Sequence, residues 1–426
     1  MLYLICLNNK LFEIKTWERK KGMNREQKDF WFIGGNARLV RNVNRSVILN
    51  IIRELQPISR SEIAKISGLN KSTVSNIVGE LISQDLVLEE EWRDSKIGRN
   101  PINLRLKLGK HFVGAINFDY PFSKIAISDI DGKLLSISYM QNDGFSGTEF
   151  IEKCIKELIA VKERLGIKRL RGIGVSVAGI INQKDMYVYY APRLGWSNIE
   201  IGSIFRKYFD EDCFIAMKND AKAAALAELW FGKYRKRLKD FVYVYIGDGI
   251  GTGIVLDRNL VDGVHYASGE FGHTTIIERG ELCSCGNNGC WEAYASNKAT
   301  LKYYLIKKRM PLDNSVGIAF EDIVGLAKRG DKDAREVLRR AGHYIGLGVS
   351  NILKAIDPQA IIIGGEITQV FDLIYPEIEE TIYERSFLGL EKNVEILPTS
   401  LDVKPQLIGA ATLAISEIFT DYKIVK

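Results

Sequence analysis

The sequence predicts a small N-terminal domain of three helices and a two-stranded wing, followed by a larger layered α/β body. Apolar residues have helical spacing from about residue 44, and two strand-like stretches follow before residue 108. Beyond that point, short apolar strands alternate with amphipathic helices. The length of 426 residues also exceeds that of one ordinary domain.

Charge is unevenly distributed along the chain. The formal net charge is +6, yet residues 1–110 contain 20 Lys and Arg against 12 Asp and Glu, and the remainder is slightly acidic. This concentration of positive charge indicates a polyanionic partner, although a solvated basic surface has the same composition. No stretch has the roughly 18 apolar residues of a membrane span, and Met1–Leu7 is a poor signal peptide. We therefore expect a cytoplasmic protein without membrane contact.

The first 40 residues show no sustained periodicity, and we interpret them as a tail. A second methionine, Met23, leaves open whether residues 1–22 belong to the native protein.

Apolar spacing and a capping signal predict the first two helices. Residues 46–55 form the first helix, which Pro57 ends. Ser59 and Glu62 then form a capping box, in which the hydroxyl accepts from a free amide and the carboxylate reaches back. The second helix follows, and Gly68 gives the next turn its backbone freedom. The apolar residues expected to face the core are Val47, Ile48, Ile51, Ile52, Leu55, Ile63, Ala64 and Ile66.

A third helix runs from Lys71 to about Gln84 and has the layout of a recognition helix. Its apolar residues form one stripe, whereas its polar residues gather on the other face near the N-terminus. The apolar stripe locks such a helix to its domain, and short polar groups at the leading end meet base edges. The alternative is a helical hairpin used for dimerisation. The residues expected to contact DNA are Asn70, which can cap the helix, with Lys71, Ser72, Thr73, Ser75 and Asn76.

Two predicted strands, Leu86–Glu90 and Ile102–Leu108, flank a polar loop. Strands and loop together predict a wing. Arg99 lies at a loop tip flanked by glycine and proline, which suits insertion into a minor groove or contact with phosphates. Arg93 and Lys96 of the same loop are further candidate DNA contacts. Capping, turn, polar leading face and basic wing together predict a winged helix-turn-helix spanning residues 41–108.

A cluster of soft ligands follows in the body. His273, Cys283, Cys285 and Cys290 have the spacing His-x9-Cys-x-Cys-x4-Cys. Three thiolates and one imidazole make a closed tetrahedral zinc site, which predicts a structural Zn²⁺ rather than a catalytic one. A chance grouping of thiols is the alternative.

Two further features are less specific. Residues 245–253 alternate glycine with other residues after a strand, so their amides suit an anion, but a glycine-rich hairpin without a ligand fits equally well. Asn219 and Asp220 open a helix, where an amide and a carboxylate side by side can hold two sugar hydroxyls or act as a general base. An ordinary helix cap is the simpler interpretation of this pair.

Five segments resemble the ROK family of repressors, open reading frames and kinases. They read GIGVSVAG at 172–179, YAPRLGW at 190–196, NDAKAAALAE at 219–228, GEFGH at 269–273 and CSCGNNGCWE at 283–292. The resemblance extends from about Asn44 to the C-terminus. It implies an actin/hexokinase-like, ribonuclease H-like body of two lobes around a sugar cleft. The first lobe then spans 109–225 and is completed by a helix within 405–426, and the second spans 226–404 with the zinc site.

The resemblance also implies which residues line the cleft. His273 then binds zinc through one ring nitrogen and turns the other toward a sugar hydroxyl, so that zinc fixes its tautomer. Asp220 matches the base that deprotonates the sugar hydroxyl in the kinases. The implied sugar-binding residues are Asn219, Asp220, Glu270, His273 and Glu292.

Departures from the family pattern bear on activity. Kinases of the family grip ATP phosphates with an Asp-x-Gly-Gly-Thr loop, where this chain has NFDYPFS at 117–123. The glycine pair and the threonine are missing, and Tyr120 obstructs close backbone approach. The glycines of 247–253 and 364–365 are retained, which implies a preserved fold without nucleotide binding. Arg193 stands where the family commonly has asparagine, which puts the usual sugar preference in question.

The sequence therefore predicts a sugar-responsive transcriptional regulator that represses carbohydrate-utilisation genes and is not an enzyme. Its partners are an operator in double-stranded DNA and a sugar effector, and we expect a homodimer or homotetramer. One alternative is an ATP-dependent sugar kinase with an accessory DNA-binding domain. Another is a DNA-binding protein regulated by a protein partner. The identity of the sugar, the direction of its effect and the target genes stay open.

Overall fold

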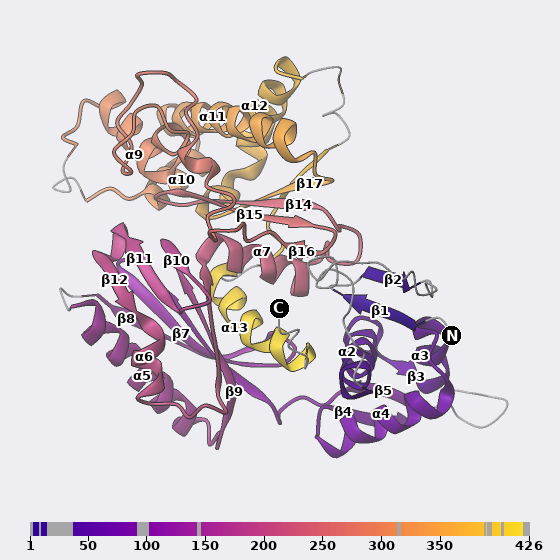
Figure 1. The fold of residues 1–426 in the computed structure, drawn as a ribbon. Coiled ribbons are helices and arrows are strands. Elements are labelled where there is room, and N and C mark those ends of the chain that lie inside the picture. Colours follow the sequence, from indigo (N-terminus) through magenta and orange to yellow (C-terminus); the bar gives the residue numbers. More distant parts are fainter. Residues whose placement is uncertain are drawn as a thin grey trace, which may run out of the picture.

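A small N-terminal unit lies beside two larger α/β lobes in the computed structural model (Figure 1). The structure describes residues 37–91, 102–142, 146–312, 317–386, 389, 394–401 and 404–420, together with the backbone of 3–7 and 10–14. In this described part of the chain, no helix is both long and apolar enough to cross a membrane.

Three helices and a three-stranded antiparallel sheet form the N-terminal unit. The strands lie in the order β3-β5-β4. Ile52, Ile63, Val78 and Leu104 are fully buried where the helices meet the sheet, and this burial holds the unit together. The elements are α2 (Ala37–Leu55), β3 (Ile58–Ser59), α3 (Arg60–Ser67), α4 (Lys71–Ser83), β4 (Val87–Glu91) and β5 (Ile102–Leu106).

The predicted turn chemistry is confirmed. Ser59 Oγ accepts from the Glu62 amide at 3.3 Å, and the Glu62 carboxylate accepts from the Ser59 amide at 2.9 Å. These hydrogen bonds from Ser59 hold the pKa of Glu62 below its usual value. Gly68 ends α3 with a left-handed φ of 69°, and Asn70 caps α4.

The start of the first helix was predicted wrongly. α2 begins at Ala37 rather than Ser46; its early turns bury Val43 and are also held by contacts with α4. Arg41 pairs with Glu80 of α4. Arg45 donates to Gln84 Oε1 at 2.8 Å. Such tertiary contacts are invisible to sequence periodicity.

Two residues expected in the core are exposed. Ile66 is 53% exposed and Leu55 is 45% exposed, since both lie in the last turn of their helices, beyond the contact with the core. Within the segment interpreted as a tail, β1 (Tyr3–Leu7) pairs antiparallel with β2 (Lys10–Ile14).

The first lobe is built on a five-stranded sheet in the order β13-β9-β6-β7-β8. β6 runs parallel to β9 and antiparallel to β7. Side chains of β6 alternate between two cores: Ile116 and Phe118 face α5, whereas Val113 and Ala115 face the C-terminal helix α13. The elements are β6 (Phe112–Phe118), β7 (Phe122–Asp129), β8 (Leu134–Gln141), α5 (Gly147–Arg164), β9 (Leu170–Val177), α6 (Ile201–Arg206), β13 (Phe214–Asn219) and α13 (Pro405–Phe419).

A small antiparallel sheet extends this lobe toward the second one (Figure 1). It consists of β10 (Ile180–Asn182), β11 (Tyr187–Ala191) and β12 (Trp196–Glu200), with the short helix η1 (Pro192–Leu194) before the last strand. This sheet and β8 were not among the predicted elements.

The second lobe has a five-stranded sheet in the order β16-β15-β14-β17-β18. Val242 and Ile363 face the helices that cover one side, and Tyr243 and Ile362 face α7 on the other. The elements are β14 (Phe241–Ile246), β15 (Ile250–Leu256), β16 (Asn259–Leu260), η2 (Phe271–His273), α8 (Glu292–Ala295), α9 (Asn297–Lys307), α10 (Phe320–Lys328), α11 (Lys332–Ile356), β17 (Ala360–Gly364), η4 (Glu366–Val370), α12 (Phe371–Glu384) and β18 (Glu395–Pro398).

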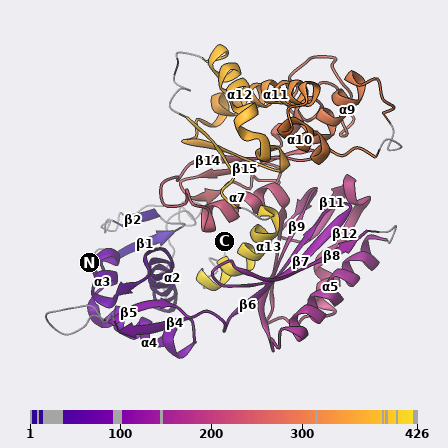
Figure 2. The same cartoon turned by 180° about the vertical axis from the view of Figure 1, so that it is seen from behind.

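Helix α7 (Asp220–Phe231) lies between the lobes and packs against both β15 and α13 (Figure 2). Small residues permit this close approach. A side chain at Gly409 of α13 would begin 2.0 Å from the Ala223 carbonyl oxygen of α7, and one at Gly253 of β15 would begin 2.5 Å from Ala225 Cβ. α7 is therefore the element through which both lobes and the C-terminal helix touch one another.

Candidate functional site

The polar face of α4 is exposed as predicted. Val74, Val78 and Leu81 are fully buried on the opposite stripe, which fixes the helix to its domain. The exposed side chains on the polar face are Lys71, Ser72, Ser75 and Asn76, while Thr73 is half-buried. A helix anchored on one side with short polar groups on the other has the geometry needed to enter a major groove.

Asn70 has a structural role in this interface. Its Oδ1 accepts from the Thr73 amide at 2.7 Å and from Ser72 Oγ at 2.8 Å. These bonds cap α4 and fix the hydroxyl at its leading end. The other predicted DNA contacts, Arg93, Lys96 and Arg99, lie outside the residues that the structure describes.

The four predicted metal ligands come together. One ligand atom from each of His273, Cys283, Cys285 and Cys290 lies within 4.8 Å of all the others. The Cys285 and Cys290 sulfurs are 3.7 Å apart, and His273 Nδ1 is 3.6 Å from Cys283 Sγ. Sulfurs around a tetrahedral zinc with bonds of about 2.3 Å are separated by roughly 3.8 Å, so the donor set fits that ion.

Backbone turns of the loop 275–290 place these sulfurs. The Cys283 amide donates to the Asn287 carbonyl at 2.8 Å, which closes the tip of the loop. Gly289 has a φ of 78°, and a side chain there would begin 1.7 Å from the Ile277 carbonyl oxygen. Thr275 forms an isolated bridge with Cys290 and brings η2, with its His273, alongside the thiols.

Glu292 connects this cluster to the glycine-rich turn. Its Oε1 accepts from Ser284 Oγ at 2.7 Å, and its Oε2 accepts from the Ile250 amide at 3.0 Å. A side chain at Gly249 would begin 2.6 Å from the same carboxylate. The carboxylate is thus held in place by the metal loop on one side and by the β14–β15 turn on the other.

The glycines of 247–253 have structural explanations. The Gly247 amide donates to the Gly249 carbonyl at 2.9 Å, which makes the tight β14–β15 turn. Gly251 and Gly253 allow α7 to lie against β15, since side chains there would begin within 2.7 Å of Ala221 and Ala225. These contacts favour the interpretation of a glycine-rich hairpin.

Asn219 and Asp220 lie at the junction of β13 and α7. Asn219 is the helix cap, accepting from the Ala221 amide at 3.0 Å, while its Nδ2 donates to the Gly179 carbonyl at 3.3 Å. The cap interpretation therefore holds for Asn219. Asp220 follows as the first residue of α7, where its Oδ1 also accepts from the Ala221 amide.

Burial raises the pKa of Asp220 to about 6. The Asp119 carboxylate adds to this shift, the Arg193 guanidinium opposes it, and Glu270 contributes a smaller increase. The pKa of Glu270 is itself raised by burial, against the effect of His273 and with that of Glu292. Electrostatic coupling thus joins Asp220, Glu270, Glu292 and the candidate metal ligand His273 in one acidic site. A carboxyl group with a shifted pKa in such a cluster is a functional candidate.

The sequence did not indicate that Arg193 has two acidic partners. Arg193 of η1 pairs with Asp119, which follows β6, and with Asp248 of the β14–β15 turn. Asp119 stands in the stretch 117–123, where the family resemblance implies the phosphate loop of the kinases. No sequence signal could have linked these residues, because they are separated by more than fifty positions.

A second feature missed from the sequence joins α2 to the body. The Arg53 guanidinium stacks over the Trp230 ring at 3.9 Å, at the end of α7, and lies 5.7 Å from the Phe419 ring of α13. Burial lowers the pKa of Arg53 to about 10, which leaves it charged at neutral pH. Its neighbour Glu54 pairs at 3.5 Å with Arg258, a residue that follows β15. We call these residues the α2 junction.

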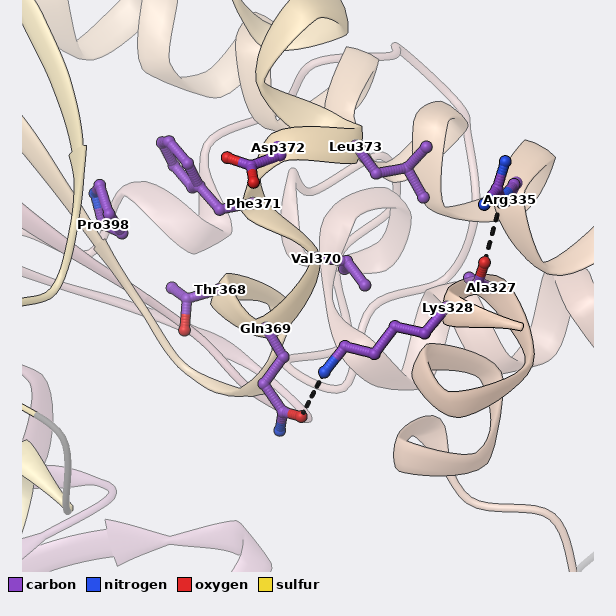
Figure 3. Close-up of a pocket in the computed structure, with 10 residues that line it drawn as sticks. All are labelled: Ala327, Lys328, Arg335, Thr368, Gln369, Val370, Phe371, Asp372, Leu373 and Pro398. Carbon is purple, nitrogen blue, oxygen red and sulfur yellow. Dashed lines mark hydrogen bonds between the residues drawn. The ribbon is translucent and has the colours of Figure 1, made fainter. Parts of the chain in front are cut away.

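The hollow drawn in Figure 3 lies elsewhere, between α10, α11 and the start of α12. Its volume is about 400 Å³. Lys328 and Gln369 meet across it at 3.3 Å. None of the predicted sugar, metal or DNA residues lines it.

Comparisons with known proteins place the chain. Residues 122–417 match the ROK family, and residues 42–90 match the MarR family. The chain belongs to the ROK family. It is 32% identical over 396 residues to a xylose repressor from Caldicellulosiruptor bescii, covering 91% of this chain and 98% of the repressor.

Solved structures agree with this assignment. A ROK family transcriptional regulator, described as a homologue of the Escherichia coli MLC protein, matches this ROK protein with a TM-score of 0.78 at 26% identity, covering 89% of this chain and 97% of its own. A ROK family glucokinase from Streptomyces griseus, solved with glucose and AMPPNP, has a TM-score of 0.63 at 24% identity and covers 72% of this chain and 99% of its own. The glucokinase shows the shared fold of the body.

Three predictions are confirmed by these comparisons. The ROK resemblance is correct, and the fold is a winged helix-turn-helix followed by a two-lobed actin-like body. The prediction of a sugar-responsive DNA-binding transcriptional regulator also holds, since a xylose repressor and a ROK transcriptional regulator match about nine-tenths of this chain, including its DNA-binding domain.

Proposed function

We propose that this ROK protein represses carbohydrate-utilisation genes and that a sugar bound between its lobes changes its affinity for operator DNA. One observation carries the proposal. The acidic cluster around Asp220 lies at one end of α7, and Arg53 of the DNA-binding domain stacks on Trp230 at the other end. A single helix thus contacts both the acidic cluster and the DNA-binding domain, which gives one route for coupling between two ligands.

The proposed sugar ligands are Asn219, Asp220, Glu270, His273 and Glu292. Carboxylates are strong acceptors for sugar hydroxyls, and the Nε2 of His273 is on the opposite side of its ring from the thiols. Xylose is the first candidate effector, because the repressor from Caldicellulosiruptor bescii is named for it. The test is operator affinity measured with and without xylose and a panel of other aldoses. A response to none of them contradicts the sensor role.

We further propose that His273, Cys283, Cys285 and Cys290 hold a structural zinc ion. The all-protein donor set has no open position for water, so the ion supplies rigidity rather than chemistry. It also fixes the ring of His273, which leaves one nitrogen oriented for a sugar.

Kinase activity is the rival function, and we propose that it is absent. Residues 117–123 lack the glycine pair and the threonine of the phosphate loop that the resemblance implies for the kinases, so this backbone does not offer phosphates the same close approach. The measurement is sugar-dependent ATP turnover in the full chain. Turnover that is lost in Asp220→Asn would restore the kinase alternative.

The recognition face gives a direct prediction. Ser75→Ala or Asn76→Ala is expected to relax sequence preference, because each base contact is worth about 1–3 kcal/mol. Arg93→Ala or Arg99→Ala in the wing loop instead weakens binding to all sequences and lowers the salt slope by about 1. Affinities for operator and mismatched duplexes at several salt concentrations separate the two outcomes. Ser83→Ala, on the exposed last turn of α4, is the control. If Asn76→Ala leaves both affinity and sequence preference unchanged, the proposed recognition face is wrong.

The α2 junction gives a second prediction, on the coupling between sugar and operator binding. Arg53→Ala is expected to leave sugar affinity within about twofold, yet to reduce the ratio of operator affinities with and without sugar toward one, from a typical coupling of about 5- to 150-fold. The measurements are sugar titration and operator binding on the same preparations. Arg60→Ala is the matched control, because Arg60 pairs at 2.9 Å with Glu89, which lies inside the DNA-binding domain. An undiminished sugar response in Arg53→Ala excludes the junction as the route.

A further inference from the structure

One arginine joins the two lobes beside the proposed sugar site. Arg193 Nη1 lies 3.3 Å from Asp119 Oδ1, and its Nη2 lies 2.9 Å from Asp248 Oδ2. Nη2 also donates to the Tyr120 carbonyl at 3.0 Å. Asp119 belongs to the first lobe and Asp248 to the second, so the planar guanidinium is a bridge between them. The N–H donors of a guanidinium have a fixed, forked arrangement, which suits a bridge between two carboxylates better than an ammonium group does.

The two ends of the bridge differ in exposure. The Arg193 side chain is 29% exposed and that of Asp119 is 18% exposed, whereas that of Asp248 is 57% exposed. Asp119 is also 3.4 Å from Lys124 Nζ, which anchors it within the first lobe. Burial lowers the pKa of Arg193, but Asp119 and Asp248 outweigh this effect and the net shift is upward. The contact to the second lobe is therefore the one that lobe movement can make or break.

One residue of the bridge, Arg193, stands where this chain departs from the common ROK pattern. Asp119 matches the aspartate of the Asp-x-Gly-Gly-Thr pattern, although the glycine pair and the threonine that follow it are missing. The structure brings this aspartate and the arginine into contact. An asparagine in place of Arg193 would carry no charge.

The bridge also sets the charge of the sugar site. Asp119, Arg193 and Glu270 all act on Asp220, and Arg193 is the cation among them. Acidic groups therefore outnumber basic ones around the cleft even with Arg193 present. A ligand carrying a carboxylate or phosphate is repelled there, whereas a neutral sugar is not.

We propose that Arg193, held by Asp119 and Asp248 across the cleft, is a specificity-determining residue that draws the lobes together around an uncharged sugar. The inference rests on the proposed sugar site and names the class of its ligand. The glycine pair and the threonine of the phosphate loop are missing beside this bridge, so closure in this chain depends on the sugar and on Arg193 without a nucleotide.

Three sugars with one ring configuration test the ligand class. Xylose, glucose and glucuronate differ only at C5, which carries a hydrogen, a hydroxymethyl group or a carboxylate. Calorimetric titration of the full chain is expected to give glucuronate an affinity at least about tenfold below that of glucose or xylose. Glucuronate binding more tightly than both would make Arg193 a carboxylate receptor and overturn the proposal.

Substitution at Arg193 tests the residue. Arg193→Gln is expected to weaken binding of the preferred neutral sugar about tenfold at pH 7 and to move the pH midpoint of binding upward, because Asp220 loses its cationic neighbour. Arg193→Lys keeps the charge without the fork and should restore the pH midpoint but only part of the affinity. Arg169→Gln, which disrupts a surface pair with Asp212, is the matched control.

The outcomes are distinguishable from a failure of the proposed function. If the wild type binds none of the sugars, the sensor function itself is wrong, and this inference fails with it. If the wild type binds a neutral sugar and Arg193→Gln matches Arg169→Gln in affinity and pH midpoint, the inference alone is overturned.

Discussion

An Asp220→Asn variant is expected to bind the effector sugar about 10- to 150-fold more weakly than the wild type at pH 7. The substitution keeps the shape of the side chain but removes its charge, and a hydrogen bond to an ionised group is worth about 1.5–3 kcal/mol. Calorimetric sugar titration measures the loss. Operator affinity without sugar should stay unchanged, since Asp220 begins α7 in the body, whereas the recognition face lies on α4 of the DNA-binding domain.

The pH dependence of the wild type follows from the same group. With the pKa of Asp220 raised to about 6, the carboxylate is mostly protonated at pH 5 and mostly ionised at pH 7. Sugar affinity should therefore rise about tenfold over that range, and this rise should disappear in Asp220→Asn.

Stability should move in the opposite direction. The folded-state pKa lies above the unfolded value, so the unfolded chain loses its proton first and stability falls as pH rises from about 4 to 6. Asp220→Asn removes this penalty and should not lower the unfolding temperature at pH 7. Asp212→Asn, on an exposed side chain, should alter neither property. Unchanged sugar affinity in Asp220→Asn would exclude this carboxylate from the site.

The second large effect is expected at the metal cluster. Cys290→Ser should reduce bound zinc from one ion per chain to a small fraction and lower the unfolding temperature by about 10 °C. Structural zinc sites contribute several kcal/mol to folding, and 1 kcal/mol shifts a large domain by about 2–4 °C. Elemental analysis and thermal unfolding measure the two effects. Sugar binding should weaken too, because His273 and Glu292 are positioned from the same loop.

Cys213→Ser separates metal loss from the loss of a buried thiol. Cys213 is buried in the first lobe, away from the cluster, and burial raises the pKa of its thiol. This control should retain full zinc and lose little stability. Equal metal content in Cys290→Ser and Cys213→Ser would show that Cys290 is not a ligand.

Local signals account for what could be predicted about the fold. The Ser59–Glu62 capping box, the left-handed Gly68 and the Asn70 cap depend on neighbouring residues alone, and all three are present. The C-terminal helix was also predicted within residues 405–426, and it is observed at Pro405–Phe419. The start of α2 was missed, and contacts with Glu80 and Gln84 of the α4 segment help to hold its first turns.

In the candidate site, too, some residues could be predicted from local sequence and others could not. The four metal ligands were recognisable because they lie within eighteen residues and their chemistry is specific. The family resemblance supplied Glu270 and Glu292. For Asn219 and Asp220, the residues alone left a helix cap as the simpler interpretation. That interpretation holds for Asn219, whereas the neighbouring Asp220 has the shifted pKa of a functional group.

The sequence by itself determined that this chain has a recognition helix, a zinc-type ligand set and a ROK body, because each is written in contiguous residues. Only the tertiary structure decided how these parts communicate. Arg53 meets Trp230, and Arg193 meets both Asp119 and Asp248, at sequence separations that no local pattern spans. The physical reason is that charge pairs and ring stacking act over a few ångströms in space, and folding alone sets those distances.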